Sequence, residues 1–266
     1  MSIAEIVIAC ALAGGLAIPF SMVGQGGGST YVPILLAVGM EMHEASTTSL
    51  FMIMLASISA TFVFGRSKTV DWKLLMAVAI PSLASSFAGG FTAQWVSVPA
   101  LKILFAVVLM IAAIFMARPV TREGAVPTFM PRTRLWNRVC GDFKYAIDLS
   151  VIPVVTLAGF IAGMIGVGGG LFVLPLLALL FGCPLRVAIG VSSTYVGLAA
   201  VTGFVGHLAG GDPFDIWVAL PLAAAAFIGA RIGPTLSLKT DTDKLRWILA
   251  IILVGLAGWM IAKIFV

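Results

Sequence analysis

Two glycine-rich runs carry the residues of this chain that are best placed for chemistry. The first spans Gly24–Thr30, and the second, Gly166–Gly170, begins 142 residues after it. Both read Gly-x-Gly-Gly-Gly, and in both a proline follows after four intervening residues. Glycines leave backbone N–H groups open to a ligand, and a helix that starts there presents the positive end of its dipole. The chemistry that this pattern predicts is anion binding by the backbone.

Short polar side chains near both runs provide further hydrogen-bond donors. These hydroxyls either contact an oxyanion or cap the start of a helix. The glycines either bind a ligand or allow two helices to pack closely. Arg231 either attracts an anion at an inner vestibule or is a snorkelling residue at the membrane interface. The candidate substrate-binding residues are Gln25, Gly26, Gly27, Gly28, Ser29, Thr30, Thr48, Ser49, Gly168, Gly169, Gly170, Ser192, Ser193 and Arg231.

The composition excludes a soluble globular protein. Of the 266 residues, 61% are hydrophobic and 10% are charged, whereas soluble domains carry about 25% charged residues. The apolar segments are long and unbroken, which favours membrane-spanning helices over a barrel with its alternating pattern. We therefore expect an all-α polytopic protein of the cell (inner) membrane, with membrane lipid around it and no nucleic-acid partner.

Ten apolar segments divide equally between two halves of the chain. Eight are long enough to span a membrane, or nearly so, while the two that follow the glycine runs reach about half of a hydrocarbon core. The sequence thus predicts about eight spanning helices and two short half-helices. The segments are 3–23, 30–40, 45–65, 72–93 and 99–117 in the first half, and 149–166, 171–182, 187–207, 216–234 and 246–264 in the second.

Matching motifs indicate that the two halves, 1–117 and 149–266, arose by duplication. If the basic loops face the cytoplasm, 14 of the 16 Lys and Arg residues lie inside, as the positive-inside rule requires. Both termini are then outside, and the two halves are repeats inverted across the membrane plane. Besides the glycine runs, the matched stretches are Ala45–Ser49 with Ala188–Ser192, and Pro81–Gly89 with Pro221–Gly229.

The segment 118–148 joins the two repeats and is expected to be a cytoplasmic connector. Its apolar residues between Leu135 and Ile147 recur at helical spacing. This pattern predicts an amphipathic helix on the inner membrane surface. A tethering linker is the simpler interpretation of its role, and gating or partner binding is the alternative. The basic residues of the opposite face are Arg132, Arg134, Arg138 and Lys144.

Groups that cation pumps, metal sites and enzymes need are missing from the expected membrane core. No Asp or Glu lies in the middle of a spanning segment, which disfavours cation antiport and proton pumping. The three cysteines share no metal spacing with His43 and His207, and no nucleophile–base pair is visible. We expect no metal, no cofactor and no enzymatic activity. Each histidine lies at the outer end of a segment, where a surface position is the simpler interpretation and a proton relay the alternative.

The duplicated glycine runs with their prolines, and the Ala-x3-Ser stretches at 45–49 and 188–192, resemble those of the sulfite exporter TauE/SafE family of membrane permeases. The resemblance covers essentially the whole chain and its two-half organisation. It implies transport of sulfur-containing anions such as sulfite, sulfonates or sulfoacetate-like compounds.

The sequence as a whole thus predicts a secondary transporter, an exporter of sulfite or organosulfonates, working by alternating access around a midplane site. A passive anion channel and a carrier of small carboxylates are the alternatives. A coupling ion, either a proton or sodium, is left open.

Overall fold

The computed structural model describes residues 3–117, 135–238 and 242–262, and most of these are helical. All ten apolar segments predicted from the sequence form helices. The longer ones are α1 (Ile3–Met22), α3 (Met42–Arg66), α4 (Trp72–Ala93), α5 (Val98–Ala117), α6 (Val151–Ile165), α8 (Leu185–Gly210), α9 (Ile216–Ser237) and α10 (Thr242–Ala262). The short ones are α2 (Gly28–Ala37) and α7 (Gly170–Pro175), which continues as a π-helical turn over Leu176–Leu180.

The helices have the length and surface of a polytopic membrane protein. Five of them, α1, α3, α4, α8 and α9, are long and apolar enough to cross a bilayer among the described residues. Exposed tryptophans lie near helix ends: Trp72 at the start of α4, Trp95 two residues after its end, Trp217 on α9 and Trp247 on α10. Tryptophan near the ends of apolar helices is typical of the two membrane–water interfaces. The total of eight spans stays a prediction.

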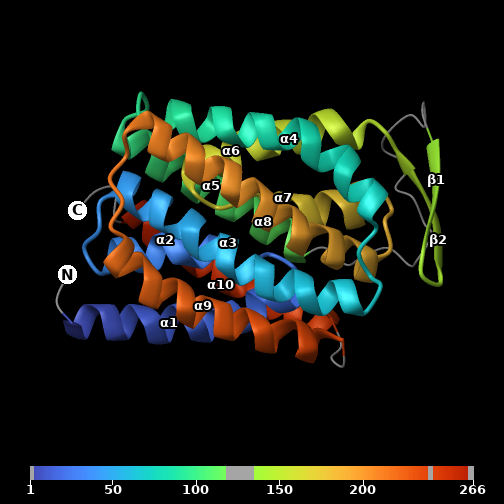
Figure 1. Cartoon of the computed structure of the whole chain (residues 1–266), viewed down its shortest axis with the longest axis horizontal. Helices are drawn as coiled ribbons and strands as arrows, with labels where there is room; N and C mark the ends of the chain where they lie inside the picture. Colours follow the sequence, from blue (N-terminus) through green and yellow to red (C-terminus); the bar gives the residue numbers. More distant parts are fainter. Residues whose placement is uncertain (1–2, 118–134, 239–241, 263–266) are drawn as a thin grey trace.

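The two halves of the chain are interleaved. Helices that pack side by side follow the order α1, α9, α3, α8, α4, α6, so that α9 lies between two helices of the first half and α4 between two of the second (Figure 1). The short helices α2 and α7 pack on α3 and α8, while α5 and α10 pack against each other. Neither half therefore folds around its own core.

The bundle has two distinct ends (Figure 1). At one, which we call the terminal end, α1 begins and α10 ends. At the other, the hairpin end, two antiparallel strands extend away from the helices: β1 (Leu135–Cys140) and β2 (Phe143–Asp148). The loop between α3 and α4 also lies at the hairpin end, and the loop between α8 and α9 at the terminal end.

The hairpin corrects the amphipathic helix predicted for 118–148. That prediction is wrong for residues 135–148, and residues 118–134 lie outside the described residues. Exposure alternates residue by residue along β1, which is the period of a strand. Gly141 has a φ of 54° in the two-residue turn, and a glycine at positive φ is the usual signal of a tight hairpin. The helical spacing of the apolar residues was coincidental.

Asp71, the N-cap residue of α4, anchors the hairpin. Nη2 and Nε of Arg138 donate to its two carboxylate oxygens at 2.6 and 3.1 Å, and the Tyr145 hydroxyl donates at 2.7 Å. Burial alone would raise the pKa of Asp71, but the hydrogen bonds from Arg138, Tyr145 and the Leu74 amide hold that pKa below its ordinary value. The hairpin is thus tied to α4 by a pair that is charged at neutral pH.

Candidate functional site

Each glycine run ends one helix and begins the next with the same backbone geometry. Gly24 and Gly166 follow α1 and α6 with φ of 71° and 78°, and the next amide donates to the carbonyl five residues earlier at 3.0 Å in both runs. This is the hydrogen bond of a Schellman helix end. Gly27 and Gly169, with φ of 81° and 83°, precede the first residues of α2 and α7. Glycine adopts such angles without a side-chain penalty.

The two runs pack directly against each other in the buried interior. A Cβ atom on Gly28 would overlap the carbonyl oxygen of Val167, and one on Gly170 would lie 2.9 Å from the Cα of Gln25. Gly28 and Gly170 hold the same position in their runs, and so do Gln25 and Val167. The contact is therefore reciprocal, and it requires glycine because backbone meets backbone.

Serines from the helices that follow brace the breaks across the two halves. The Ser49 hydroxyl on α3 donates to the carbonyl of Gly166 at 2.9 Å, and the Ser192 hydroxyl on α8 donates to that of Gly24 at 3.0 Å. Thr30 donates to the carbonyl of Gly27 at 2.8 Å. These three predicted ligands thus use their hydroxyl hydrogens on carbonyls, and their demonstrated role is to position the backbone.

Two tyrosines that the sequence interpretation missed cover the middle glycines. The hydroxyl of Tyr31 lies where a Cβ of Gly27 would be, and a Cβ on Gly169 would lie 2.8 Å from the Tyr195 ring. Both tyrosines are completely buried, and the Tyr195 hydroxyl is hydrogen-bonded to Ser82 of α4. The small number of tyrosines in the chain could have drawn attention to these two. Of the three, Tyr31 follows a glycine run, and Tyr195 follows Ser192 and Ser193.

Five hydroxyls buried near the runs have no hydrogen-bond partner among the described residues: that of Tyr31 and four from serine and threonine. Ser29 lies in the first turn of α2, Thr48 on α3 and Ser193 on α8, and all three were predicted from the sequence. Ser57 on α3, which was missed, is the fourth, with 1% of its surface exposed. Unpaired buried hydroxyls carry a desolvation cost that a ligand oxygen would remove.

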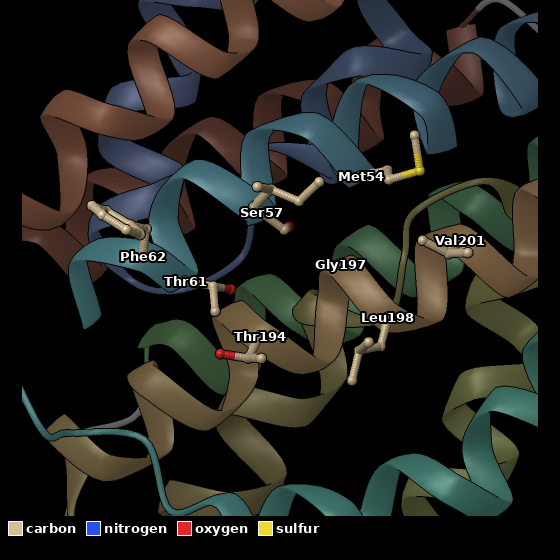
Figure 2. Close-up of a pocket in the computed structure, with 9 residues that line it drawn as sticks. Met54, Ser57, Thr61, Phe62, Thr194, Gly197, Leu198 and Val201 are labelled. Atoms are coloured by element: carbon tan, nitrogen blue, oxygen red, sulfur yellow. The ribbon is translucent and has the colours of Figure 1, made fainter. Parts of the chain in front are cut away.

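A cavity of about 290 Å³ lies between α3 and α8 (Figure 2). Ser57 lines it, and a Cβ on Gly26 would lie 3.0 Å from the Ser57 hydroxyl oxygen, so this serine adjoins both the cavity and the first glycine run. Thr61 and Thr194 add hydroxyls from α3 and α8. The remaining lining is Met54, Ile58, Phe62, Gly197, Leu198 and Val201.

Arg231 lies at the rim of this cavity and not among the residues that contact the glycine runs. Its guanidinium is 5.0 Å from the ring centroid of Phe62, and that of Arg66 is 4.1 Å from the same centroid. Both arginines are exposed, and cations over an aromatic face are attracted to it. The structure thus places two cations beside the cavity toward the hairpin end.

Aromatic rings join α3 and α8 toward the terminal end. Ring centroids of Phe51, Phe204 and Phe214 lie 5.0 to 5.7 Å apart. The 143-residue spacing that relates Ser49 to Ser192 also relates Phe51 to Thr194 and Phe204 to Thr61. Two aromatic positions at one end thus correspond to threonines of the cavity at the other.

The two histidines are not the surface residues that the simpler interpretation expected. His207 is completely buried, and the side chain of His43 is 20% exposed. Both face Asp212, in the loop that follows α8. Sequence distance concealed this grouping, because 164 residues separate the histidines.

An apolar helical bundle with two touching backbone breaks and an uncharged polar centre defines a polytopic membrane protein. Over residues 7–260 the chain matches the model of the family described as sulfite exporter TauE/SafE, and it belongs to that family. It is therefore a membrane transporter of the TauE/SafE type.

Curated relatives match along nearly their whole length. The probable membrane transporter protein YunE of Bacillus subtilis is 27% identical over 88% of this chain and 89% of its own. Probable membrane transporter proteins of Methanocaldococcus jannaschii and Sinorhizobium fredii are 26% and 25% identical, each over 90% of this chain and over 88% and 91% of their own.

Proposed function

We propose that this protein is a secondary transporter that exports small sulfur-containing anions, with a site formed by the two glycine runs and the hydroxyls beside them. Ser29, Thr48, Ser57 and Ser193 would donate hydrogen bonds to the anion. The amides that begin α2 would add a positive dipole end, as at the half-helices of other transporters. Ser49, Ser192 and Thr30 would hold the backbone in place.

One observation carries this proposal: irregular backbone and unpaired hydroxyls lie together in an apolar interior, and no buried carboxylate lies beside them in the part of the chain that the structure describes. Non-helical backbone at membrane depth is tolerated where it lies inside protein or lines a polar cavity. The buried Asp71 and Asp148 both lie at the hairpin end. Neutral donors without nearby negative charge favour an anion over a cation.

We further propose that the halves are inverted repeats, in the cell inner membrane, with both termini outside. The reciprocal contacts support this arrangement, since Gly28 meets Val167 as Gly170 meets Gln25. The described basic side chains of the α3–α4 loop and the hairpin gather at the hairpin end, which the positive-inside rule assigns to the cytoplasm.

Alternating access would follow from the difference between the two ends of α3 and α8. The rings of Phe51 and Phe204 close the space toward the terminal end, whereas Thr61 and Thr194 leave a cavity toward the hairpin end. This asymmetry supports a state that is closed outside and accessible inside. Rocking of the interleaved halves would exchange the two arrangements.

The lining of the cavity favours an anion with a hydrocarbon part. Its walls are apolar apart from the hydroxyls of Ser57, Thr61 and Thr194, and Arg66 and Arg231 lie at its rim. A small organosulfonate would place its carbon chain against Met54 and Val201 and its sulfonate near Ser57. Sulfite, which lacks the carbon chain, would bind more weakly.

Ligand binding and flux test the proposal. In a thermal-shift screen of purified protein, sulfonates and sulfite should raise the melting temperature more than small carboxylates do, because a ligand stabilises the fold that it binds.

Gly27→Leu and Gly169→Leu should each abolish flux in proteoliposomes. Intact flux in both variants at normal expression would sink the site assignment, and a conductance far above carrier turnover would indicate a channel.

A further inference from the structure

A buried ionisable cluster lies at the terminal end, apart from the glycine runs. The carboxylate of Asp212 stands between two imidazoles: Oδ2 is 2.5 Å from Nδ1 of His207, and Oδ1 is 3.5 Å from Nδ1 of His43. The exposed fraction of the side chains falls from 20% at His43 to 7% at Asp212 and 0% at His207. The three residues form a path from the surface to the interior.

The hydrogen bonds of His207 fix how many protons the pair holds. Nε2 lies 2.9 Å from the carbonyl oxygen of Gly163, and a carbonyl can only accept, so Nε2 carries a hydrogen. A neutral His207 would then face Asp212 with the lone pair of Nδ1. An ionised carboxylate at 2.5 Å from that lone pair would repel it. The geometry therefore requires one more proton, placed between Nδ1 and Oδ2.

The helices packed against the His207 ring bring no other titratable group to the extra proton. The other acidic residues at this end, among the described residues, are Glu5 in the first turn of α1, Glu41 and Glu44 at the start of α3, and Asp215 of the α8–α9 loop. Helices α4 and α6 meet His207 at Gly90 and Gly163, and neither carries a titratable residue at the terminal end. No metal-binding group of His, Cys, Asp or Glu was found among the described residues.

The cluster is also joined to the glycine site by a short structural path. Gly163, which accepts the hydrogen bond of His207, lies in the last turn of α6, three residues before Gly166. Gly166 begins the second glycine run. Loss of the proton would make Nδ1 of His207 and the carboxylate of Asp212 repel each other, and a shift of the His207 ring would move or weaken its hydrogen bond to Gly163 at the end of α6.

We propose that His207 and Asp212 bind the coupling proton of this transporter, and that His43 exchanges it with the solution at the terminal end. Nδ1 of His43 makes no hydrogen bond at 3.5 Å from Oδ1, so in loading the protonated ring first moves closer to Asp212 and transfers its proton from Nδ1 to Oδ1. Rotation of the carboxyl group about its Cβ–Cγ bond then brings that oxygen and its proton to Nδ1 of His207, and His43 regains a proton from water. Unloading reverses these transfers. Histidine suits the role because its two ring nitrogens can each donate or accept a proton. The inference rests on the proposed function and names its driving ion.

Proteoliposomes loaded with radiolabelled sulfite test the coupling. In the wild type, a more acidic outer solution should accelerate sulfite efflux, with a limit of roughly ten-fold in the concentration ratio for a pH difference of one unit. His207→Gln and Asp212→Asn should lose this response but keep sulfite counterflow at equal pH. Asp215→Asn is the matched control, because it neutralises an exposed acid of the same loop. It should behave like the wild type.

A second measurement does not depend on the substrate. The chain has two histidines, so a ¹⁵N-histidine label gives two sets of ring signals, which His43→Gln assigns. We expect both ring nitrogens of His207 to carry hydrogen bonds to acceptors in the acid form, and Asp212→Asn to abolish that signature. A neutral imidazole at His207 throughout about pH 5 to 8 would overturn the proton site.

Failure of the coupling proposal can be distinguished from failure of the proposed function. Sulfite counterflow without any gradient response in the wild type, or a gradient response that survives both His207→Gln and Asp212→Asn, overturns the coupling proposal and leaves the transporter proposal standing. Absence of counterflow in the wild type for both sulfite and a small organosulfonate overturns the proposed substrate class, and the histidine signals then decide the proton site alone. If His207→Gln does not fold, Asp212→Asn carries the test.

Discussion

The hydroxyl of Ser49 donates a hydrogen bond of 2.9 Å to the carbonyl oxygen of Gly166, which lies 117 residues further along the chain. Ser192, 143 residues after Ser49, bonds to Gly24 in the same way, across the same interface in the opposite sense. Each half thus holds the backbone break of the other. The site depends on the pairing of the halves, and its stability should respond to changes in either.

Removing the Ser49 hydroxyl should destabilise the fold. Ser49→Ala leaves the Gly166 carbonyl buried without its donor, which costs about 1–3 kcal/mol. Ser59→Ala is the matched control, because Ser59 is equally buried on α3 but its hydroxyl has no hydrogen-bond partner among the described residues. Denaturant unfolding in detergent should show a lower free energy of unfolding for Ser49→Ala alone. Equal values for the two variants would contradict the bracing role.

Gly28 should tolerate no side chain, because a Cβ there would overlap the Val167 carbonyl. Gly28→Ala should lower the free energy of unfolding by about 1–3 kcal/mol, as overpacking does. In Gly15→Ala the added Cβ meets nothing within 4 Å on α1, and the change should stabilise the helix by up to about 1 kcal/mol. Melting temperatures of the two purified variants should therefore move in opposite directions.

The anchor between Asp71 and Arg138 should fail in acid and not at neutral pH. The folded-state pKa of Asp71 lies below its ordinary value, so the carboxylate stabilises the fold above the unfolded value of about 3.9. That contribution is lost as the pH falls through the lower folded-state pKa. Asp71→Asn keeps an N-cap but breaks the pair, at a cost of about 3 kcal/mol. The melting-temperature difference from wild type should stay constant between about pH 5 and 8 and shrink in stronger acid. A difference that changes across neutral pH would contradict this assignment.

Arg231 should affect the entry of an anion at the rim near Phe62. Arg231→Gln should slow initial sulfite uptake from the hairpin side by about ten-fold at low salt, because charged clefts raise association rates. High salt should remove most of the difference. Arg186→Gln removes another exposed arginine, at the start of α8, and serves as the control. Equal effects of the two substitutions would support simple snorkelling of Arg231.

Phe204 should help to close the space between α3 and α8 toward the terminal end. In a background without native cysteines, Ser57→Cys should react with membrane-impermeant thiol reagents from the hairpin side. Adding Phe204→Ala removes a ring that packs on Phe51 and Phe214, and labelling from the terminal side should then appear. Terminal-side labelling of Ser57→Cys with Phe204 intact would show that the rings do not close this end.

Local sequence was sufficient for the elements that a single stretch of chain specifies. The long helices follow from uninterrupted apolar residues, and the breaks follow from glycines that allow positive φ, as at Gly27 and Gly169. Local spacing failed in the connector, because the same apolar residues fit two periods. The turn at Gly141 and the ion pair of Arg138 with Asp71 selected the strands.

The candidate site was only partly visible from the sequence, for a physical reason. Residue type identified Ser29, Thr48 and Ser193 as possible donors, but whether a hydroxyl is free depends on a partner elsewhere in the chain. Ser49 and Ser192 proved to have such partners.

The sequence by itself determined a membrane protein with two glycine-rich backbone breaks, because composition and local conformational freedom are properties of neighbouring residues. The tertiary structure alone decided that the breaks touch and that Asp212 brings His43 and His207 together. Such contacts arise when the halves interleave, and they join residues that sequence spacing cannot relate.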